Sequence, residues 1–367
     1  MWQAARADRG RQTPFLAVDH PRLIGNIRDM AGRVARRGGA STPHLKTHKN
    51  LQIARAQVAA GATAATVATV AEAHLAFDAG FESVLFAYPP FPGGRLRALP
   101  ELAERGRVAV TCHSAEQVAL LAGLGGAYDV YWEVDSGTGR LGTAPGEPTA
   151  VAAASARFSD RVRLRGLMTF AGHAYGARAP EELVAVRDQQ DRALSDSRAA
   201  LASRGIDVPV RSVGVTPLAP VDSGEAEEYR YGNYVFYDAT QVALAETAPG
   251  GPGLDDCALA VISTVVDAPS EGRLVLDAGA KSLPAEKMTS LSSGFGAVAG
   301  HPDIVIDKLY EEHGLASRGA GSRDLRPGDR VAVIPNHACT AVNLFHQYAV
   351  YDASSFVETW PIQARRR

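Results

Sequence analysis

Hydrophobic and polar positions follow a repeated order of strand and helix over the first two thirds of the chain. Short apolar runs alternate with segments that have the period of an amphipathic helix, the longest over residues 181–204. Because strands that alternate with helices pair in parallel, eight such units predict an α/β fold with a (β/α)8 barrel over residues 20–245. The predicted strands are Pro43–Thr47, Ala64–Val70, Ser83–Tyr88, Val108–Cys112, Val130–Asp135, Leu164–Phe170, Arg211–Thr216 and Arg230–Phe236.

The pattern changes after residue 245, where strand-like runs follow one another without long helices between them. This arrangement predicts a second, mostly antiparallel β domain over residues 246–367. A further strand, Phe15–Asp19, is surplus to the barrel, and we expect the segment 13–19 to join the second domain. The strands predicted in this domain are Leu259–Val266, Arg273–Asp277, Arg330–Ile334 and Tyr348–Tyr351.

Composition narrows the class of protein. The 367 residues are 46% hydrophobic and carry a net charge of −2, so no broad positive surface is expected to hold nucleic acid. Three widely spaced cysteines do not make a disulfide framework, which favours a reducing compartment. The polar N-terminal residues do not resemble a signal peptide, and no apolar run is long enough to span a bilayer. We therefore expect a cytoplasmic protein without a membrane partner.

A lysine lies at the end of the first predicted barrel strand, in the sequence Pro43-His-Leu-Lys-Thr-His-Lys49. Active sites of such barrels lie at the C-terminal ends of the strands. Lys46 there could act as a Schiff-base amine, because burial and neighbouring charges readily shift a lysine pKa. Taken alone, a lysine at a strand end is more often a solvated surface residue.

Three other strand ends carry glycine, hydroxyl or amide groups. Asp135-Ser-Gly-Thr-Gly-Arg-Leu-Gly142 combines close backbone approach with Arg140, which could donate to a phenolate or a carboxylate. The last two strands lead to Thr216 and to Gly232 and Asn233, where barrels often bind phosphate through N–H groups and hydroxyls. Each of these motifs alone could equally be an ordinary turn.

The second domain contains a histidine and a cysteine two residues apart, in Pro335-Asn-His-Ala-Cys-Thr340. In an extended chain His337 and Cys339 would face the same way. Imidazole and thiolate suit zinc, and two protein ligands leave coordination positions open for substrate and water. The alternative for an isolated pair is a buried cysteine beside a hydrogen-bonded histidine.

In this order, the segments resemble the metal-activated fold-type III pyridoxal-phosphate enzymes, which share an alanine-racemase-like barrel. The resemblance covers residues 13–352 and is nearer to D-serine dehydratase than to D-threonine aldolase. Its most specific parts are residues 44–49, 172–175, 232–238 and 335–339. One departure is Met168, where the family often has an aromatic residue seven positions before the tyrosine that matches Tyr175.

The resemblance implies a role for each candidate residue. Lys46 would carry pyridoxal 5'-phosphate as a Schiff base and act as a base, and Arg140 would approach the phenolic oxygen of the cofactor. Tyr175 would lie beside the cofactor or the substrate. The resemblance also implies a divalent metal, zinc with manganese as the alternative, and a homodimer. The residues that would bind the phosphate are Thr216, Gly232 and Asn233, and those that would bind the metal are His337 and Cys339.

Within this family two reactions remain open for a small D-β-hydroxy amino acid. Cys339 favours a dehydratase that converts D-serine to pyruvate and ammonia, because the related aldolases more often have His-x-Asp at the metal site. The alternatives are a D-threonine aldolase, which yields glycine and an aldehyde, and a D-threo-3-hydroxyaspartate dehydratase. A cofactor-binding protein without catalysis is the alternative from another class, and the long segment after the barrel argues against it.

Overall fold

The structure is a computed structural model that describes residues 2–89, 94–155, 157–246, 250–270, 272–287, 289 and 293–365. Its chain divides into two compact units, and each is described by itself. We call them the β unit (Met1–Arg28, Tyr175–Ala179 and Asn233–Gln363) and the barrel unit (Asp29–Ala174, Pro180–Gly232 and Ala364–Arg367).

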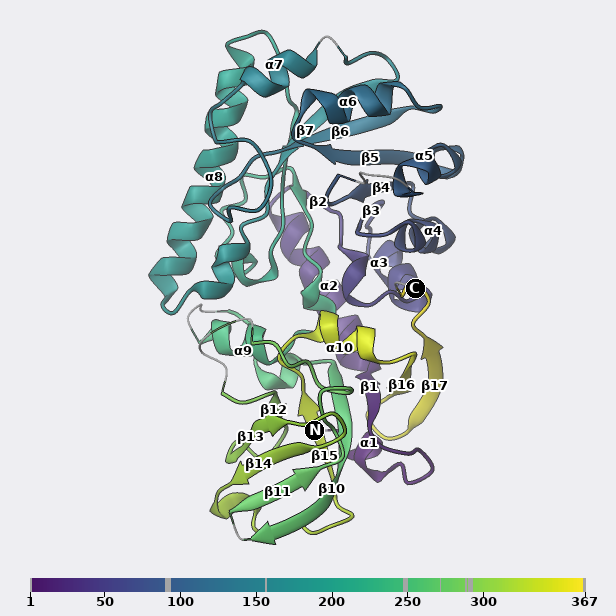
Figure 1. The fold of residues 1–367 in the computed structure, drawn as a ribbon, viewed down its shortest axis with the longest axis vertical. Helices are drawn as coiled ribbons and strands as arrows, with labels where there is room; N and C mark the ends of the chain where they lie inside the picture. Colours follow the sequence, from purple (N-terminus) through teal and green to yellow (C-terminus); the bar gives the residue numbers. More distant parts are fainter. Residues whose placement is uncertain are drawn as a thin grey trace. The chain divides into compact units, whose positions relative to one another are not determined.

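Eight parallel strands make up the sheet of the barrel unit, in the order β2-β9-β8-β7-β6-β5-β4-β3. Figure 1 labels β2 to β7 of this sheet. The sheet returns on itself where His44, just after β2, forms a parallel bridge with Thr66 of β3. The predicted α/β barrel is therefore confirmed. The strands are β2 (Ala40–Ser41), β3 (Ala64–Val67), β4 (Ser83–Phe86), β5 (Arg107–Cys112), β6 (Tyr128–Glu133), β7 (Val162–Met168), β8 (Val210–Val213) and β9 (Glu228–Tyr229).

Helices connect most of these strands, and polar caps set their limits. Asn50, Thr69 and Ser114 each accept the backbone N–H three residues ahead, which satisfies a donor that the first helical turn leaves free. Gly80 ends α4 with a φ of 101°, a conformation that favours glycine. The helices are α2 (His20–Arg36), α3 (Leu51–Ala59), α4 (Val70–Ala79), α5 (Gly94–Arg105), α6 (Ala115–Ala122), α7 (Thr149–Ser155) and α8 (Pro180–Ala202).

The interior of the barrel explains the methionine that departs from the family pattern. Met168 is 1% exposed and packs in a buried cluster with Leu85, Ala109, Tyr131 and Val210. Its sulfur also accepts a hydrogen bond of 2.9 Å from the hydroxyl of a threonine on β5. In this chain the position therefore fills the barrel core.

The β unit is built on a nine-stranded, mostly antiparallel sheet, in the order β11-β14-β13-β12-β15-β10-β1-β16-β17 (Figure 1). Strand β1 pairs antiparallel with β10 and parallel with β16. The strands are β1 (Phe15–Asp19), β10 (Leu259–Ser270), β11 (Arg273–Leu276), β12 (Ala297–Val298), β13 (Ile304–Leu309), β14 (Gly314–Arg318), β15 (Arg330–Ile334), β16 (Gln347–Tyr351) and β17 (Phe356–Pro361).

One buried face of this sheet packs into a core that includes Phe15, Ile262, Ile334 and Tyr351. A short N-terminal helix, α1 (Gln3–Ala7), closes part of it, since Ala5 is 1% exposed. No helix in the described part of the chain is both long and apolar enough to cross a membrane.

Two predicted barrel strands differ from the structure. The segment predicted as the strand Pro43–Thr47 contains a 3-10 turn, η1 (Leu45–Thr47), and the strand β2 ends earlier. The segment predicted as Arg230–Phe236 follows β9 and contains another 3-10 turn, η4 (Asn233–Val235). In the first of these segments the His44 ring accepts the backbone N–H of Lys46, a local bond that competes with the sheet ladder.

Candidate active site

Residues 42–50 of the barrel unit are all buried except Lys46, which is exposed. The lysine lies in the 3-10 turn η1, so it does not end an extended strand as the sequence predicted. His44 caps the turn, because its Nδ1 accepts the backbone N–H of Lys46 at 3.3 Å. The amine is therefore open to a ligand while the backbone that carries it is fixed.

Both histidines around Lys46 are held in the neutral form. Burial lowers the pKa of His44 well below its usual value, and the charges of Lys46 and Arg230 lower it further. Burial also lowers the pKa of His48 to about 3, although its hydrogen bonds act in the opposite direction. His48 Nδ1 accepts the backbone N–H of Asn50 at 3.2 Å. These imidazoles are therefore neutral near pH 7 and act as hydrogen-bond acceptors that fix the backbone around Lys46.

The second lysine of the motif, Lys49, has a different environment. Its Nζ lies 3.8 Å from Glu72 Oε1, and the two side chains are 5% and 1% exposed. The other oxygen of Glu72 accepts the backbone N–H of Ala68 at 2.7 Å. Lys49 is thus part of a buried ion pair, whereas Lys46 has the accessible amine that a Schiff base needs.

Lys46 and Arg140 lie over the same aromatic ring. Lys46 Nζ is 5.9 Å and Arg140 Cζ is 4.6 Å from the centre of the Phe170 ring. Arg140 also lies 4.0 Å from Glu133 Oε1 and is half-exposed. The structure therefore brings together two of the residues that the sequence predicted for the site.

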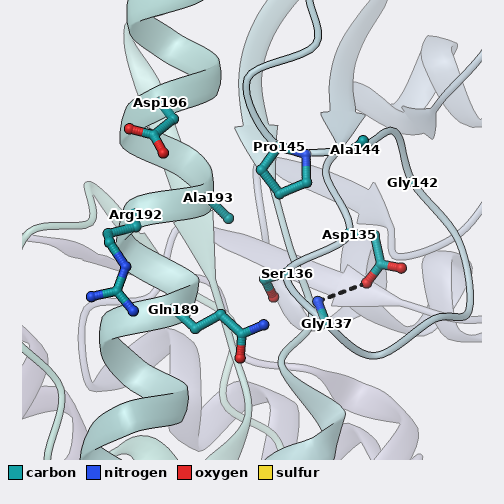
Figure 2. Close-up of a pocket in the computed structure, with 10 residues that line it drawn as sticks. All are labelled: Asp135, Ser136, Gly137, Gly142, Ala144, Pro145, Gln189, Arg192, Ala193 and Asp196. Atoms are coloured by element: carbon teal, nitrogen blue, oxygen red, sulfur yellow. Dashed lines mark hydrogen bonds between the residues drawn. The ribbon is translucent and has the colours of Figure 1, made fainter.

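The glycine-rich loop that carries Arg140 is held by Asp135. Its carboxylate accepts the N–H of Gly137 at 2.9 Å and the N–H of Gly139 at 3.0 and 3.1 Å. Figure 2 shows the first of these bonds. Gly142 has a φ of 109°, and a Cβ there would lie 2.7 Å from the backbone nitrogen of Asp135. This close approach is why the loop requires glycine.

A cavity of about 510 Å³ lies between this loop and helix α8 (Figure 2). Gln189, Arg192 and Asp196 of α8 line one side, and residues of the glycine-rich loop line the other. Neither Lys46 nor Arg140 is among the described residues that line it. We therefore do not assign this cavity to the cofactor.

The residues predicted to bind phosphate follow the last two barrel strands. Thr216 opens a 3-10 turn, η3 (Thr216–Leu218), and among the described residues its hydroxyl has no hydrogen-bond partner. Gly232 packs against the lysine segment, since a Cβ would lie 3.0 Å from Thr47 Oγ1 and 3.1 Å from His44 Cβ. A hydroxyl without a partner and a backbone free of side-chain bulk fit an anionic group such as phosphate.

Two buried charged residues of the barrel unit, Arg230 and Glu133, were not predicted from the sequence. Arg230 is 5% exposed and donates to Ser212 Oγ at 2.5 Å and to the carbonyl of Thr169 at 2.7 Å. Glu133 ends β6, and burial raises its pKa although Arg140 and Arg230 oppose this shift. Its Oε2 has no hydrogen-bond partner among the described residues. The sequence did contain a signal for them, namely a charged residue within or beside an apolar strand. Charged residues are rarely buried unless they are paired.

In the β unit, the start of a helix brings His337 and Cys339 together. His337 caps α10 (Ala338–Leu344), so the predicted extended geometry of this segment is wrong. Burial lowers the pKa of His337, but the thiol of Cys339 and the carboxylates of Asp238 and Glu286 raise it to about 9. His337 Nδ1 is buried and has no hydrogen-bond partner among the described residues. The surroundings therefore attract a cation.

His337 and Cys339 would supply only part of the coordination of a metal, and substrate or water would supply the rest. In the described part of the chain, no group of three His, Cys, Asp or Glu side chains has the geometry to hold a metal ion. A pair of one imidazole and one thiolate would leave coordination positions for substrate and water. A closed structural zinc site would need four protein ligands.

Tyr175 lies close to the same charges. Its hydroxyl accepts a hydrogen bond of 3.4 Å from Gln241 Nε2. Burial raises the pKa of Tyr175 well above its usual value, and the charges of Asp238 and Cys339 raise it further. The phenol therefore stays protonated and can donate a hydrogen bond.

Comparisons with known proteins agree with these observations. Residues 18–239 match the family model described as "Alanine racemase, N-terminal domain", and residues 258–351 match "Putative serine dehydratase domain". D-threo-3-hydroxyaspartate dehydratase of Delftia sp. (strain HT23) is 32% identical over 95% of this chain and 96% of its own length. D-threonine aldolase of Arthrobacter sp is 29% identical over 96% and 92%.

Solved structures give the same result. The Delftia dehydratase superposes with a TM-score of 0.87 at 28% identity, covering 99% of this chain and 100% of the other. A cysteine-to-alanine variant of that enzyme is described as a metal-free form and gives the same TM-score. The family models cover both parts of the chain, and the relatives span nearly all of it. The chain therefore belongs to the fold-type III pyridoxal-phosphate enzymes, which have an alanine-racemase-like barrel. It is a lyase of the group that includes hydroxyaspartate dehydratase, D-threonine aldolase and D-serine dehydratase.

Proposed function

We propose that this lyase is a metal-dependent dehydratase of small D-β-hydroxy amino acids. The observation that carries the proposal is the pair of His337 and Cys339 at the start of α10, in surroundings whose negative charges raise the histidine pKa to about 9. Imidazole with thiolate favours zinc over manganese, because the softer sulfur ligand suits zinc. Cys339 also agrees with the family resemblance, in which the dehydratases have His-x-Cys.

Each residue then has a task in the elimination. Pyridoxal phosphate would supply an electron sink for charge at Cα, and the metal would act as a Lewis acid on the β-hydroxyl. Lys46 would hold the cofactor through its accessible ε-amine, and the same amine, when free, would act as the base that takes the α-proton of the substrate. Arg140 orients the cofactor ring, and Thr216, Gly232 and Asn233 bind its phosphate.

The metal pair and the tyrosine act on the leaving group. His337 and Cys339 hold the metal and leave coordination positions for the substrate hydroxyl. Tyr175 remains protonated, so it can donate a hydrogen bond to the substrate or the cofactor. Loss of the α-proton to Lys46 and of hydroxide from Cβ would give an enamine, and its hydrolysis by one water would give a keto acid and ammonia.

The proposal leaves two candidate substrates, D-serine and D-threo-3-hydroxyaspartate, and the test must distinguish between them. D-serine, converted to pyruvate and ammonia, is the prediction from the sequence, and the match to a serine dehydratase model supports it. The 32% identity with the Delftia enzyme supports D-threo-3-hydroxyaspartate. A homodimer and a cytoplasmic location complete the proposal, and size-exclusion chromatography with light scattering tests the dimer.

Product analysis tests the reaction. The purified protein is supplied with D-serine, D-threo-3-hydroxyaspartate and D-threonine, with and without a chelator. Keto acid and ammonia that disappear with the chelator and return with zinc are the expected result. Glycine and acetaldehyde from D-threonine would replace the dehydratase with an aldolase, and turnover that survives chelation would remove the metal from the proposal.

A further inference from the structure

Asp238 is a carboxylate of the β unit with no exposed surface. It caps helix α9 (Ala239–Ala245), because its Oδ1 accepts the backbone N–H of Gln241 at 3.0 Å. A buried carboxylate is costly unless its oxygens are hydrogen-bonded. The groups that bond to it therefore indicate what it does.

The second oxygen of Asp238 joins two predicted parts of the active site. Oδ2 accepts Asn233 Nδ2 at 2.5 Å and the backbone N–H of Ala338 at 2.9 Å. Asn233 belongs to the segment predicted to bind phosphate, and Ala338 lies between the predicted metal ligands His337 and Cys339. One oxygen atom therefore contacts both the phosphate segment and the metal segment.

The bond to Asn233 also limits what that residue can give to phosphate. A carboxylate oxygen can only accept, so the amide atom that faces Asp238 is the nitrogen. The amide oxygen of Asn233 is buried without a partner among the described residues, and an acceptor atom does not bind an anion. The side-chain amide of Asn233 is thus not available to an anion, which leaves its backbone N–H as the donor that this residue could give to phosphate.

His337 points one ring nitrogen toward the same oxygen. Its Nδ1 lies 3.9 Å from Asp238 Oδ2, just beyond hydrogen-bond distance, and has no hydrogen-bond partner in the described part of the chain. A carboxylate that accepts the second ring N–H of a metal-bound histidine fixes the orientation of the ring. Because the two oxygens of Asp238 already accept three N–H groups, the carboxylate is suited to hold a ligand and not to be one.

We propose that Asp238 is a positioning residue that presents His337 Nε2 to the metal and couples the metal segment to the phosphate segment through Asn233. The inference rests on the proposed metal role of His337 and Cys339. It predicts that zinc and the cofactor each bind more tightly when the other is present, since both depend on one buried group.

The test compares Asp238→Asn with a matched control, Asp277→Asn. Asp277 is also in the β unit and accepts the N–H of Thr264 at 2.8 Å and the hydroxyls of Ser263 and Thr13 at 2.7 and 2.5 Å. Zinc affinity is measured by competition with a coloured chelator, and pyridoxal phosphate affinity by absorbance titration with and without zinc. Neither measurement requires turnover.

Asp238→Asn is expected to lower zinc affinity about 10- to 100-fold, the usual effect of losing such a partner. It should also abolish the dependence of cofactor affinity on zinc, while Asp277→Asn changes neither. Equal zinc affinity in the two variants would overturn the inference and leave the dehydratase proposal standing. A wild-type protein that binds no zinc would overturn both.

A second measurement uses the wild-type protein, so it does not depend on the folding of a variant. Nuclear magnetic resonance of ¹⁵N-labelled histidine in the zinc-loaded protein distinguishes the two ring nitrogens, and His337→Gln identifies the signal. We expect zinc on Nε2 and a protonated, slowly exchanging Nδ1. Zinc on Nδ1 would contradict the inference, because that nitrogen would then not face Asp238 as a donor.

Discussion

Buried histidines of the two units lie in opposite electrostatic surroundings. Burial lowers the pKa of His44 and His48 in the barrel unit, and for His44 the nearby positive charges add to this effect. In the β unit burial acts in the same direction, yet Cys339 and two carboxylates raise the pKa of His337 to about 9. The negative neighbours of His337 therefore reverse the lowering of the pKa that burial alone causes at His48.

The difference indicates which ligand suits each unit. Around Lys46 the charged neighbours include Arg140 and Arg230, which favour an anionic group such as a phosphate or a phenolate. Around His337 they are the carboxylates of Asp238 and Glu286, which together with the sulfur of Cys339 favour a cation. The charges in the barrel unit therefore suit an anionic cofactor, and those in the β unit suit a metal cation.

The largest effect is expected from Lys46→Ala. This variant should lose the Schiff-base absorbance band and about 10⁴-fold in turnover, the upper range for a general base. Its stability should change by less than about 0.5 kcal/mol, because the side chain is exposed. Absorbance spectra and chemical unfolding measure the two effects, and a retained band would refute the assignment of Lys46.

Substitution of Lys49, three residues after Lys46, should affect stability and leave the cofactor bound. Lys49→Met breaks the buried pair with Glu72, and we expect it to cost about 3–5 kcal/mol in the free energy of unfolding. The folded fraction should keep the absorbance band. If Lys49→Met lost the band and Lys46→Ala kept it, the roles of the two lysines would be reversed.

The metal pair should have the next largest effect. Cys339→Ser or His337→Gln should lower turnover by at least about 10²-fold, since a Lewis acid contributes several kcal/mol to such a step. The Schiff-base band on Lys46 should persist, which separates this defect from loss of the cofactor. Zinc content and steady-state rates provide the measurement, and a zinc-free variant with wild-type turnover would exclude the metal role.

Hydrophobic periodicity and helix-terminating residues made most of the barrel predictable from the sequence. Conformations that depend on local polar contacts could not be predicted in this way. The strands β3 to β8 follow from apolar periodicity, and helix ends follow from stops such as Gly80. The conformation of Lys46 depends on a bond from its own N–H to the His44 ring, which no propensity anticipates. Strands such as β13 and β17 were missed because they carry charged or exposed residues on their outer faces.

The candidate site was predictable only where its residues are close in sequence or part of a familiar motif. Lys46, Arg140 and the pair of His337 and Cys339 belong to such motifs. Asp238 was missed because its bond to Ala338 joins positions 100 residues apart, and only the folded chain brings them together. The same holds for Glu133, whose significance comes from burial beside arginines.

The glycine-rich loop allows a smaller and more local test of the barrel environment. Gly142→Ala forces a Cβ within 2.7 Å of backbone at a φ of 109°, and we expect a loss of at least about 2 kcal/mol in stability. Gly139→Ala is the control, because nothing lies within 4 Å and its φ of 70° costs about 1 kcal/mol. A shift of the cofactor spectrum in Gly142→Ala alone would show that the loop positions Arg140. Equal unfolding free energies in the two variants would contradict the packing argument.

The smallest effect follows from the neutral state of His48. Its folded pKa of about 3 lies below the unfolded value of about 6.5, so below pH 6.5 the unfolded chain binds a proton that the folded chain does not. The stability from this group is therefore complete above pH 6.5 and is lost as the pH falls toward 3, with a slope approaching about 1.4 kcal/mol per pH unit. Urea unfolding of the wild type and of His48→Gln between pH 7 and 4 measures this slope. His48→Gln should show the shallower dependence, and parallel curves would mean that the barrel unit does not hold this histidine neutral as its contacts imply.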